Sequence, residues 1–379
     1  MNLSGERSSL LVSIILPTYN GSKYLRKSIE SCLSQTYRHI EVIIVNDCST
    51  DDTALIINHY ASIDKRVQII NNAANQKLPQ SLNIGFAAST GTYFTWISDD
   101  NIFASDAIAT LVESMEQDPG IDIVYSSYYF INEKGDRLDS FGYEPEALLF
   151  KCAPGACFLY KKEVHTLLKG FDPTKFRMED MDFWLRAAVR FRYKYIDQKH
   201  LYYYRKHANN LTSAIYSDAN LYRQYRQNHF LSFQHFFRNG LGYYITDQEL
   251  ELHLELYFED IVINKNWNFN LADKVIGYIN YLDNLITLPW ENIGFDKKRI
   301  NDIINSKKNR IVSLVINDLV FENKLLQNEN PKIAKIINKP ISWYYKEYEV
   351  LPSWYKKLGH IIKAWQGNKN WRSLINKGK

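Results

Sequence analysis

Short apolar runs alternate with amphipathic stretches along the first hundred residues of the chain. The apolar runs are rich in β-branched residues and predict strands at residues 11–16, 42–45, 67–70 and 93–97. Between them, apolar side chains recur at helical spacing, which predicts helices at residues 23–35, 53–61 and 78–89. Strands and helices that alternate in this way are typical of an α/β domain, with a mostly parallel sheet and helices on both faces.

The pattern changes further along the chain. Up to about residue 215, three strand patterns and one helix pattern are mixed, at residues 123–130, 156–160 and 193–204 (strands) and 180–192 (helix). From about residue 220 long helical patterns dominate, and one opens with a capping box at Thr246–Glu249. We therefore expect an α/β domain at residues 1–220, followed by a mainly α-helical region at residues 221–379.

The last segment combines an apolar stripe with basic residues. After Pro352, four apolar side chains fall on one helical face: Trp354, Leu358, Ile361 and Trp365. No acidic residue occurs in residues 356–379. A basic amphipathic helix of this kind binds the surface of an anionic membrane, or else its two tryptophans dock on the preceding domain. Both interpretations stay open at this point.

Composition excludes several classes of protein. The hydrophobic share of 45% and the charged share of 23% are ordinary for a globular chain. A net charge of +4 demands no nucleic-acid partner. The four cysteines lack the paired spacing of a zinc site, which indicates reduced thiols in a cytoplasmic protein. No apolar run approaches the roughly 18 residues that a membrane span needs, and the first apolar run leads into Pro17 rather than into a signal-peptide cleavage site.

Polar residues follow the ends of three predicted strands, at Thr18–Asn20, at Asp47 and at Asp99–Asn101. Ligands of parallel sheets bind beyond the carboxyl ends of the strands, so these residues are expected along one edge. Two adjacent carboxylates at such an end repel each other unless a cation or a donor lies nearby. Mg²⁺ or Mn²⁺ would resolve this conflict, because both bind carboxylates together with substrate phosphates. Taken alone, however, the pair is explained better by a helix N-terminus.

A series of short motifs occurs in a fixed order along residues 10 to 215. They are residues 14–20 (IILPTYN), 45–53 (VNDCSTDDT), 75–79 (NQKLP), 81–86 (SLNIGF), 91–93 (GTY), 98–101 (SDDN), 170–172 (GFD) and 179–180 (ED). Together they resemble the inverting family-2 glycosyltransferases. The resemblance implies the GT-A fold, a Rossmann-like α/β domain that binds a nucleotide-diphosphate sugar.

The resemblance also implies roles around the donor. Asp47 matches the residue that binds the nucleotide base, which implies uracil or another base with an N3–H group and so favours a UDP-linked sugar. The segment of Pro17, Thr18 and Tyr19 is expected against the base and ribose. Lys77 and Asn83 are further candidates for contact with the donor.

Other matches concern the metal. Asp100 corresponds to the metal ligand, and Asp99 to the residue that contacts the ribose or the metal shell. His207 forms an Arg-X-His arrangement with Arg205 and corresponds to a residue that contacts the metal or the diphosphate. Arg205 is expected in the second shell of the metal or at the acceptor. The sequence departs from the commoner Asp-X-Asp pattern, because Ile97 occupies the leading position.

An inverting reaction needs one base beside the acceptor hydroxyl, and Asp180 matches the family's base. Asp182 has another use, since Arg186 lies at i+4 on the same helix face. Glu179 is expected at the acceptor or at the helix end. The Gln-X-X-Arg-Trp segment of processive relatives is missing, which favours one sugar per encounter.

Two rival functions remain. A sugar nucleotidyltransferase would also use paired acids on Mg²⁺, but residues 16–20 offer no glycine-rich loop for a triphosphate. A non-catalytic sugar-binding protein on a transferase fold is the other alternative. The acceptor is expected to be a glycan or a lipid-linked sugar, and the basic C-terminal helix favours a lipid-linked one at the inner face of the cell membrane.

Overall fold

The structure, a computed structural model, describes residues 10–208, 210–211, 215, 218–258 and 271–326. The chain divides into two compact units. The first comprises residues 1–257 and 288–300, and the second comprises residues 258–287 and 301–379. The predicted division after residue 220 stays a prediction. The predicted amphipathic helix after Pro352 lies outside the described residues. Within the described part, no helix has the length and apolarity to cross a membrane.

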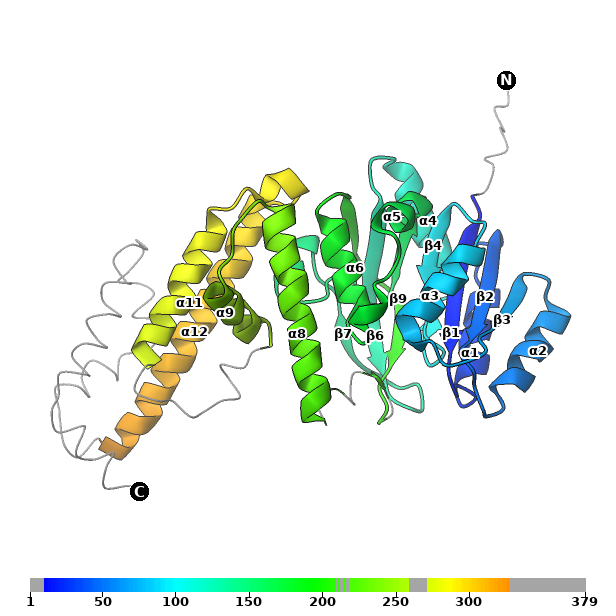
Figure 1. Ribbon diagram of the computed structural model, residues 1–379, viewed down its shortest axis with the longest axis horizontal. Coiled ribbons are helices and arrows are strands. Elements are labelled where there is room, and N and C mark those ends of the chain that lie inside the picture. Colours follow the sequence, from blue (N-terminus) through cyan, green and yellow to red (C-terminus); the bar gives the residue numbers. More distant parts are fainter. Residues whose placement is uncertain (1–9, 209, 212–214, 216–217, 259–270, 327–379) are drawn as a thin grey trace. The chain divides into compact units, whose positions relative to one another are not determined.

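A sheet of nine strands forms the centre of the first unit (Figure 1). Its order is β3-β2-β1-β4-β8-β6-β9-β5, with β7 paired to β6. The strands are β1 (Val12–Thr18), β2 (Ile40–Asn46), β3 (Val67–Asn71), β4 (Tyr93–Trp96), β5 (Ile102–Phe103), β6 (Ile123–Ile131), β7 (Arg137–Phe141), β8 (Phe158–Lys161) and β9 (Tyr193–Arg205).

Strands β1 to β4 are parallel to one another, and β9 is parallel to β6. Strand β8 runs antiparallel between β4 and β6, so β6 and β9 point in the same direction as β1. The carboxyl ends of β1, β2, β4, β6 and β9 therefore meet at one edge of the sheet. The mostly parallel sheet is the predicted fold class, and the seven predicted strands are all confirmed.

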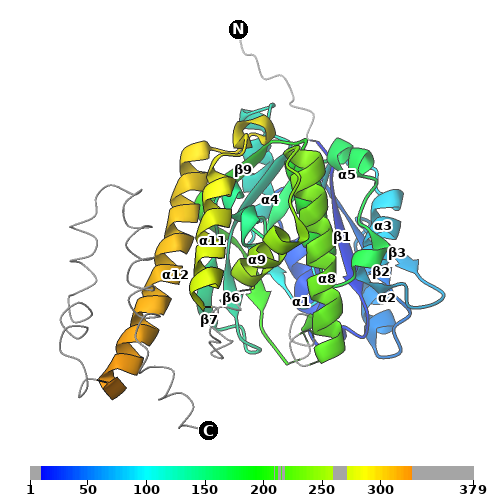
Figure 2. The same ribbon diagram turned by 60° about the vertical axis from the view of Figure 1, so that its left-hand side comes forward.

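Helices cover both faces of the sheet. The α-helices of the first unit include α1 (Leu25–Leu33), α2 (Thr53–Ile63), α3 (Lys77–Ala88), α4 (Ala107–Gln117), α5 (Lys162–Leu168), α6 (Glu179–Ala188), α8 (Ala219–His235) and α9 (Asp247–Tyr257). Strand β3 lies at one edge of the sheet with α2 beside it (Figure 2). The predicted helices are confirmed, although α6 ends four residues before the predicted residue 192.

Alternating positions of β1 face different helices. Val12, Ile14 and Leu16 belong to one apolar core together with buried residues of α1, α2 and α4. Ile15 points the other way, toward α3, where a Cβ atom on Gly85 would lie 2.5 Å from its Cγ2. Glycine at this point of α3 is what lets the helix approach the sheet so closely. Helices on both faces fully bury β1, as a continuous apolar run predicts.

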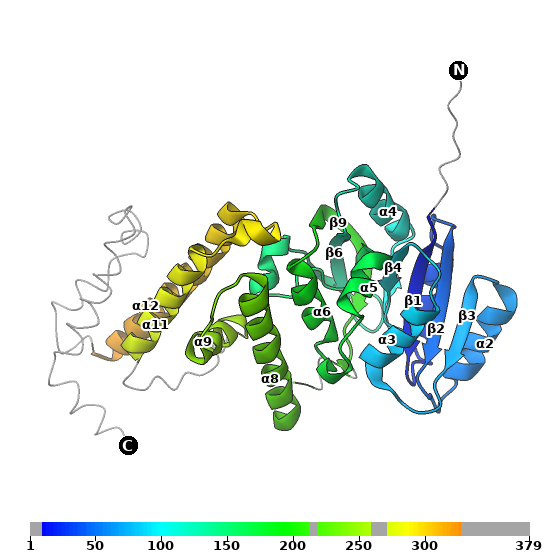
Figure 3. The same cartoon turned by 45° about the horizontal axis from the view of Figure 1, so that its top comes forward.

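Further helices follow the sheet in sequence. Helix α8 packs beside α6 (Figure 3). The capping box that opens α9 is confirmed: Thr246 N donates to Glu249 Oε2 (2.9 Å), and Glu249 N donates to Thr246 Oγ1 (3.2 Å). The described part of the second unit contains α11 (Leu271–Ile286) and most of α12 (Lys297–Leu326). The helical character predicted beyond residue 220 is therefore present.

Candidate active site

The ends of β1 and β4 are joined by a hydrogen bond between polar side chains. Thr18 Oγ1 donates to Asp99 Oδ2 over 2.6 Å. A Cβ atom on Gly21 would lie 2.1 Å from that same oxygen, so no larger residue fits at position 21. Sequence analysis missed Gly21, and its position one residue after the motif at residues 14–20 was the available signal. Burial, followed by the charge of Asp100, raises the pKa of Asp99 to about 7.

Asp100 lies at the centre of the acid cluster, which we define as Asp99, Asp100, His207 and Asn210. Its Oδ2 atom is 2.9 Å from His207 Nε2 and accepts a hydrogen bond from Asn210 Nδ2 (3.1 Å). Its Oδ1 atom is buried and has no hydrogen-bond partner within the described part of the chain. Burial raises the pKa of Asp100, while the hydrogen bond with His207 opposes that shift. One carboxylate oxygen is thus held by the protein, and the other is left for a ligand.

Asn210 was not among the predicted site residues. Besides Asp100, it contacts the strand end through Nδ2, which donates to Arg205 O (3.2 Å), and through Oδ1, which accepts from His207 N (2.6 Å). These bonds join Asn210 to the end of β9 and to the backbone of His207, whose imidazole lies against Asp100. Its place three residues after His207 was the only signal in the sequence.

Arg205 is buried, with 1% of its surface exposed, and its side chain donates hydrogen bonds to backbone groups. Nε donates to the carbonyl oxygen of Asp100 (2.9 Å), and Nη1 donates to the carbonyl oxygens of Asn132 and Glu133 (3.0 Å each). The guanidinium also lies over the Tyr24 ring, 4.7 Å from its centroid. Its own backbone N–H donates to Asn101 Oδ1 (2.7 Å). Arg205 therefore ties the ends of β4, β6 and β9 together around the acid cluster.

The burial of position 97 explains why the sequence departs from the Asp-X-Asp pattern there. The side chain of Ile97 is completely buried in the core, and its backbone N–H donates to Ile15 O (2.9 Å). The position belongs to the end of the β1–β4 ladder rather than to the open edge. A carboxylate there would be buried among apolar groups, which carries a large free-energy cost.

Asp47 follows β2 and already accepts three hydrogen bonds. Asn72 Nδ2 and Gln76 N donate to Oδ1 (2.8 and 2.7 Å), and Lys77 N donates to Oδ2 (2.9 Å). Lys77 has a positive φ of 69°, which turns its backbone N–H toward this carboxylate. The Oδ2 atom keeps acceptor capacity for a further N–H, the group that a pyrimidine base offers.

The other predicted donor contacts differ in their surroundings. Pro17 lies within β1 and is buried, whereas Tyr19 just beyond the strand is 52% exposed. The Lys77 side chain is also exposed. The amide of Asn83 is used within the fold, since Nδ2 donates to Phe171 O (2.8 Å) and Oδ1 accepts from Phe171 N (2.9 Å). Asn83 thus holds the Gly170–Phe171 turn rather than joining the acid cluster.

Three acids open helix α6 and have different environments. Asp182 is buried and accepts from Arg186 Nε and from Ser232 Oγ (2.8 Å each), which confirms the predicted i+4 pair. Asp180 accepts from Met181 N (2.7 Å) through Oδ1, and its Oδ2 atom lies 3.7 Å from the Cys152 sulfur. Burial raises the pKa of Asp180.

Glu179 is 4% exposed, and its Oε2 atom has no hydrogen-bond partner among the residues described. Burial, followed by the charge of Asp180, raises the pKa of Glu179 to about 8. Burial therefore disfavours the ionised form of both acids, and the charge of Asp180 adds to that effect on Glu179. A buried carboxylate whose pKa is raised is suited to accept a proton.

The acid cluster fits a divalent cation that is shared with a ligand. The described residues contain no group of three or more His, Cys, Asp or Glu side chains arranged around one point. Asp100 Oδ2 and His207 Nε2 nevertheless offer two adjacent ligand atoms, and the open Oδ1 of Asp100 adds a third. Mg²⁺ and Mn²⁺ commonly take only one or two protein ligands when substrate phosphates complete the shell. Imidazole favours Mn²⁺ over Mg²⁺.

Comparison with known proteins places this geometry in a family. A family model described as "Glycosyl transferase family 2" matches residues 13–166. An uncharacterized glycosyltransferase of Methanocaldococcus jannaschii is 32% identical over 248 residues, which cover 62% of this chain and 84% of that protein. One from Haemophilus influenzae is 35% identical over 128 residues, or 34% of this chain. The chain spans 51% of the length of that relative, about half.

A solved structure shares the fold. S. aureus TarS 1-349, in complex with UDP-GlcNAc, superimposes with a TM-score of 0.54 at 17% identity, over 80% of this chain and 89% of that chain. At that identity the likeness concerns the architecture alone, and it supports the predicted GT-A type of α/β fold.

Proposed function

This chain belongs to glycosyltransferase family 2, and we propose that it is an inverting, metal-dependent enzyme that adds one sugar per encounter. The donor is a nucleotide-diphosphate sugar, and UDP is the proposed nucleotide. The acceptor is a hydroxyl group of a glycan or of a lipid-linked sugar. Mn²⁺ or Mg²⁺ is the proposed cofactor.

The environment of Asp100 carries the proposal. One of its oxygens is fixed by His207 and Asn210, and the other is buried without a hydrogen-bond partner in the described chain. An unsatisfied buried carboxylate oxygen is unfavourable, so a ligand that completes it would stabilise the arrangement. Asp100 and His207 would hold the cation, and a bound cation would stabilise the negative charge of the departing nucleoside diphosphate.

The chain's own residues account for the other requirements of the reaction. Asp180 accepts the proton of the acceptor hydroxyl, and its raised pKa makes it a better base than an exposed aspartate. The raised pKa of Glu179, about 8, favours the protonated form of that acid at neutral pH. Asp47 and the exposed Tyr19 ring lie at the ends of β2 and β1, where the base and ribose of the donor would be held.

A thermal-shift screen tests the donor and the cation together. Purified chain is heated with UDP-, GDP- and CDP-linked sugars, each with Mn²⁺, with Mg²⁺ and with EDTA. A ligand at about 100 times its Kd stabilises the folded state by about 2.7 kcal/mol, so a true donor gives a clear rise in Tm. We expect the rise for a UDP-sugar with Mn²⁺ and its loss with EDTA. An EDTA-insensitive shift would reject the metal, and a shift with GDP-sugars alone would reject the uracil assignment.

Product analysis separates this function from its rivals. The chain is incubated with the donor found in the screen and with a set of glycan and lipid-linked acceptors. Formation of nucleoside diphosphate together with one added sugar of inverted anomeric configuration is the expected result. Release of pyrophosphate from a nucleoside triphosphate and a sugar phosphate would instead identify a nucleotidyltransferase. Binding without turnover of any acceptor would identify a sugar-binding protein.

We further propose that the basic C-terminal segment brings the enzyme to the cytoplasmic face of a membrane, where a lipid-linked acceptor would be found. The support is the apolar stripe after Pro352 and the absence of acidic residues at 356–379 in the sequence. Flotation of the full chain with liposomes containing anionic lipid is the test, with a version shortened at residue 352 as the control. Equal flotation of the two would reject the segment's role.

A further inference from the structure

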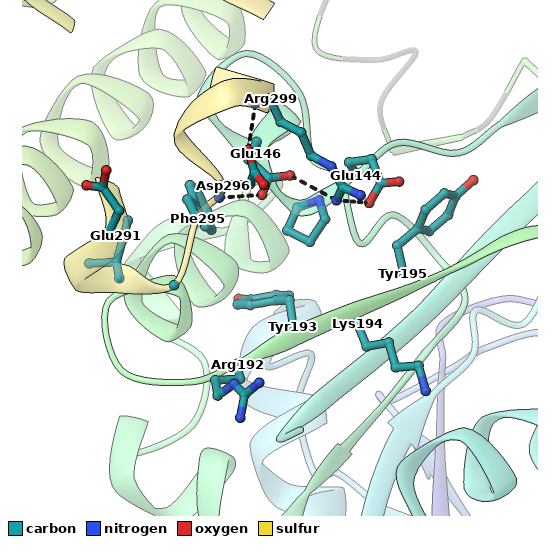
Figure 4. Close-up of a pocket in the computed structure, with 13 residues that line it drawn as sticks. Glu144, Glu146, Arg192, Tyr193, Lys194, Tyr195, Glu291, Phe295, Asp296 and Arg299 are labelled. Atoms are coloured by element: carbon teal, nitrogen blue, oxygen red, sulfur yellow. Dashed lines mark hydrogen bonds and ion pairs between the residues drawn. The ribbon is translucent and has the colours of Figure 1, made fainter. Parts of the chain in front are cut away.

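A cavity opens at the start of β9, away from the acid cluster (Figure 4). Its volume is about 620 Å³, a size typical of pockets that bind small molecules. The walls are formed by the first residues of β9, by the 3₁₀ helix η1 (Pro145–Leu149) and the residue before it, and by residues 291–299. Tyr195 precedes Arg205 by ten residues on one strand, so at about 3.3 Å per residue the two sites are roughly 30 Å apart along it.

Glu146 forms the floor of this cavity and is 3% exposed. Its Oε1 atom accepts a hydrogen bond from Asp296 N over 2.8 Å. Its Oε2 atom is buried and has no hydrogen-bond partner in the described residues, and Arg299 Nη1 lies 3.8 Å from it. Leaving such an oxygen without a donor carries a free-energy cost. A hydroxyl group of a bound ligand would remove that cost.

Glu144 and Arg299 add further polar groups at the rim. Arg299 Nη1 donates to Glu144 Oε2 over 2.7 Å, and the two side chains are 50% and 41% exposed. Figure 4 shows Glu144, Glu146 and Arg299 gathered on one side of the cavity. The guanidinium is therefore shared between two carboxylates, which leaves acceptor oxygens in excess over donors on this wall.

Aromatic rings from β9 form the opposite wall. One face of Tyr195 packs on Tyr125, with ring centroids 5.3 Å apart, and its hydroxyl is hydrogen-bonded with Ser127 Oγ. Tyr193 is fixed by its hydroxyl, which donates to Trp184 O over 2.8 Å. Rings held in this way offer rigid apolar surfaces to a ligand at little entropic cost.

The charges of the lining argue against an anionic ligand. Lys194 also lines the cavity, but Figure 4 shows its side chain directed away, and its ammonium group donates to Ser114 O over 3.4 Å. Arg192 likewise points away in that view. The cation that faces the carboxylates is Arg299, which is already paired. Carboxylate acceptors beside a flat ring suit a ligand that has many hydroxyl groups and no charge.

We propose that this cavity, which we name the Glu146 pocket, is a non-catalytic site for a neutral sugar unit of a longer glycan. Hydroxyl groups of the sugar donate to Glu146 Oε2 and to Glu144, and the ring lies against Tyr195. The proposal concerns binding only, so it does not depend on the proposed transfer reaction. A chain without transferase activity could still bind sugar here, and an active enzyme could fail to do so.

Calorimetric titration of the full chain tests the Glu146 pocket. The probes are three neutral trisaccharides, cellotriose, maltotriose and chitotriose, and one anionic trisaccharide, trigalacturonate. Saturating UDP and Mn²⁺ are present throughout, so that sugar binding at the donor site does not contribute. We expect at least one neutral trisaccharide to bind with a millimolar or lower Kd and trigalacturonate to bind more weakly.

Two variants connect the binding to the pocket. Glu146→Gln keeps an acceptor for Asp296 N, and Glu144→Gln changes a half-exposed side chain that the fold tolerates more readily. Each is expected to weaken binding about tenfold or more, equal to about 1.4 kcal/mol. Glu113→Gln on the exposed face of α4 is the matched control and should bind as the wild type does. Absence of neutral-sugar binding, unchanged binding in both variants, or tighter binding of trigalacturonate would each overturn the proposal.

Discussion

Replacement of Asp180 by asparagine should abolish transfer without unfolding the protein. Asparagine retains an oxygen that can accept the N–H of Met181, now at 2.7 Å from Oδ1, and it fits the same volume. It cannot accept a proton from the acceptor. A positioned general base contributes about 10²- to 10⁴-fold to the rate, which is about 3–5 kcal/mol of activation free energy. We expect kcat to fall by that factor while donor binding stays at the wild-type level.

The stability of this variant follows from the direction of the pKa shift. Burial raises the pKa of Asp180, so the ionised carboxylate is less stable in the folded chain than in the unfolded chain. A neutral amide avoids this penalty. The Tm of Asp180→Asn should therefore equal or exceed that of the wild type at neutral pH, as measured by differential scanning fluorimetry.

Asp182→Asn is the matched control, because the two acids lie on the same helix turn. The carboxylate of Asp182 accepts from Arg186 and from Ser232 and is 5% exposed, so its loss should destabilise the fold by about 1–3 kcal/mol. Activity per folded molecule should stay within a few-fold of the wild type. Full activity in Asp180→Asn, or equal loss of activity in both variants, would refute the assignment of the base.

Three further predictions concern pH, metal and stability. Burial and the charge of Asp180 raise the pKa of Glu179 from 4.5 to about 8, so the free energy of unfolding falls as the pH rises from 4.5 to about 8. In thermal melts, Glu179→Gln should therefore raise the Tm near pH 8 and give no gain near pH 4.5. Asn210→Ala removes a hydrogen bond to Asp100 and should weaken Mn²⁺ binding about 10- to 100-fold in titrations with UDP, with unchanged binding of UDP alone. Thr246→Ala should lower unfolding free energy by about 1 kcal/mol in urea denaturation, because it removes the cap of α9.

Local patterns were sufficient to predict most of the sheet. Strands β1, β2 and β4 are buried on both faces, so their sequences are continuous apolar runs that contrast with the amphipathic helices between them. Because parallel strands end at one edge, the positions of Asp47, Asp99 and Asp100 followed from the order of the elements alone. Strand β7 was missed since four of its five residues are exposed, which leaves no apolar alternation to detect.

Contacts between distant parts of the chain could not be predicted. Arg205 was assigned from a motif to the metal surroundings or the acceptor, but its partners at Asn132 and Glu133 lie more than seventy residues away. The Glu146 pocket depends on a bond between residues 146 and 296, which are separated by 150 positions. Such pairings arise from the packing of whole elements. Neither periodicity nor a short motif contains that information.

The electrostatics of the acid cluster favour the cation that is proposed for this edge. Asp99 shifts from a pKa of 3.8 to about 7, which corresponds to an unfavourable free energy of roughly 4 kcal/mol for the ionised form. Arg205 does not offset this charge directly, because its Nε atom bonds the carbonyl of Asp100 rather than a carboxylate. His207 contacts one oxygen of Asp100 only. The fold therefore concentrates more negative charge at the strand ends than the neighbouring side chains balance. A divalent cation that binds together with the donor diphosphate would balance the charge of the carboxylates and that of the diphosphate.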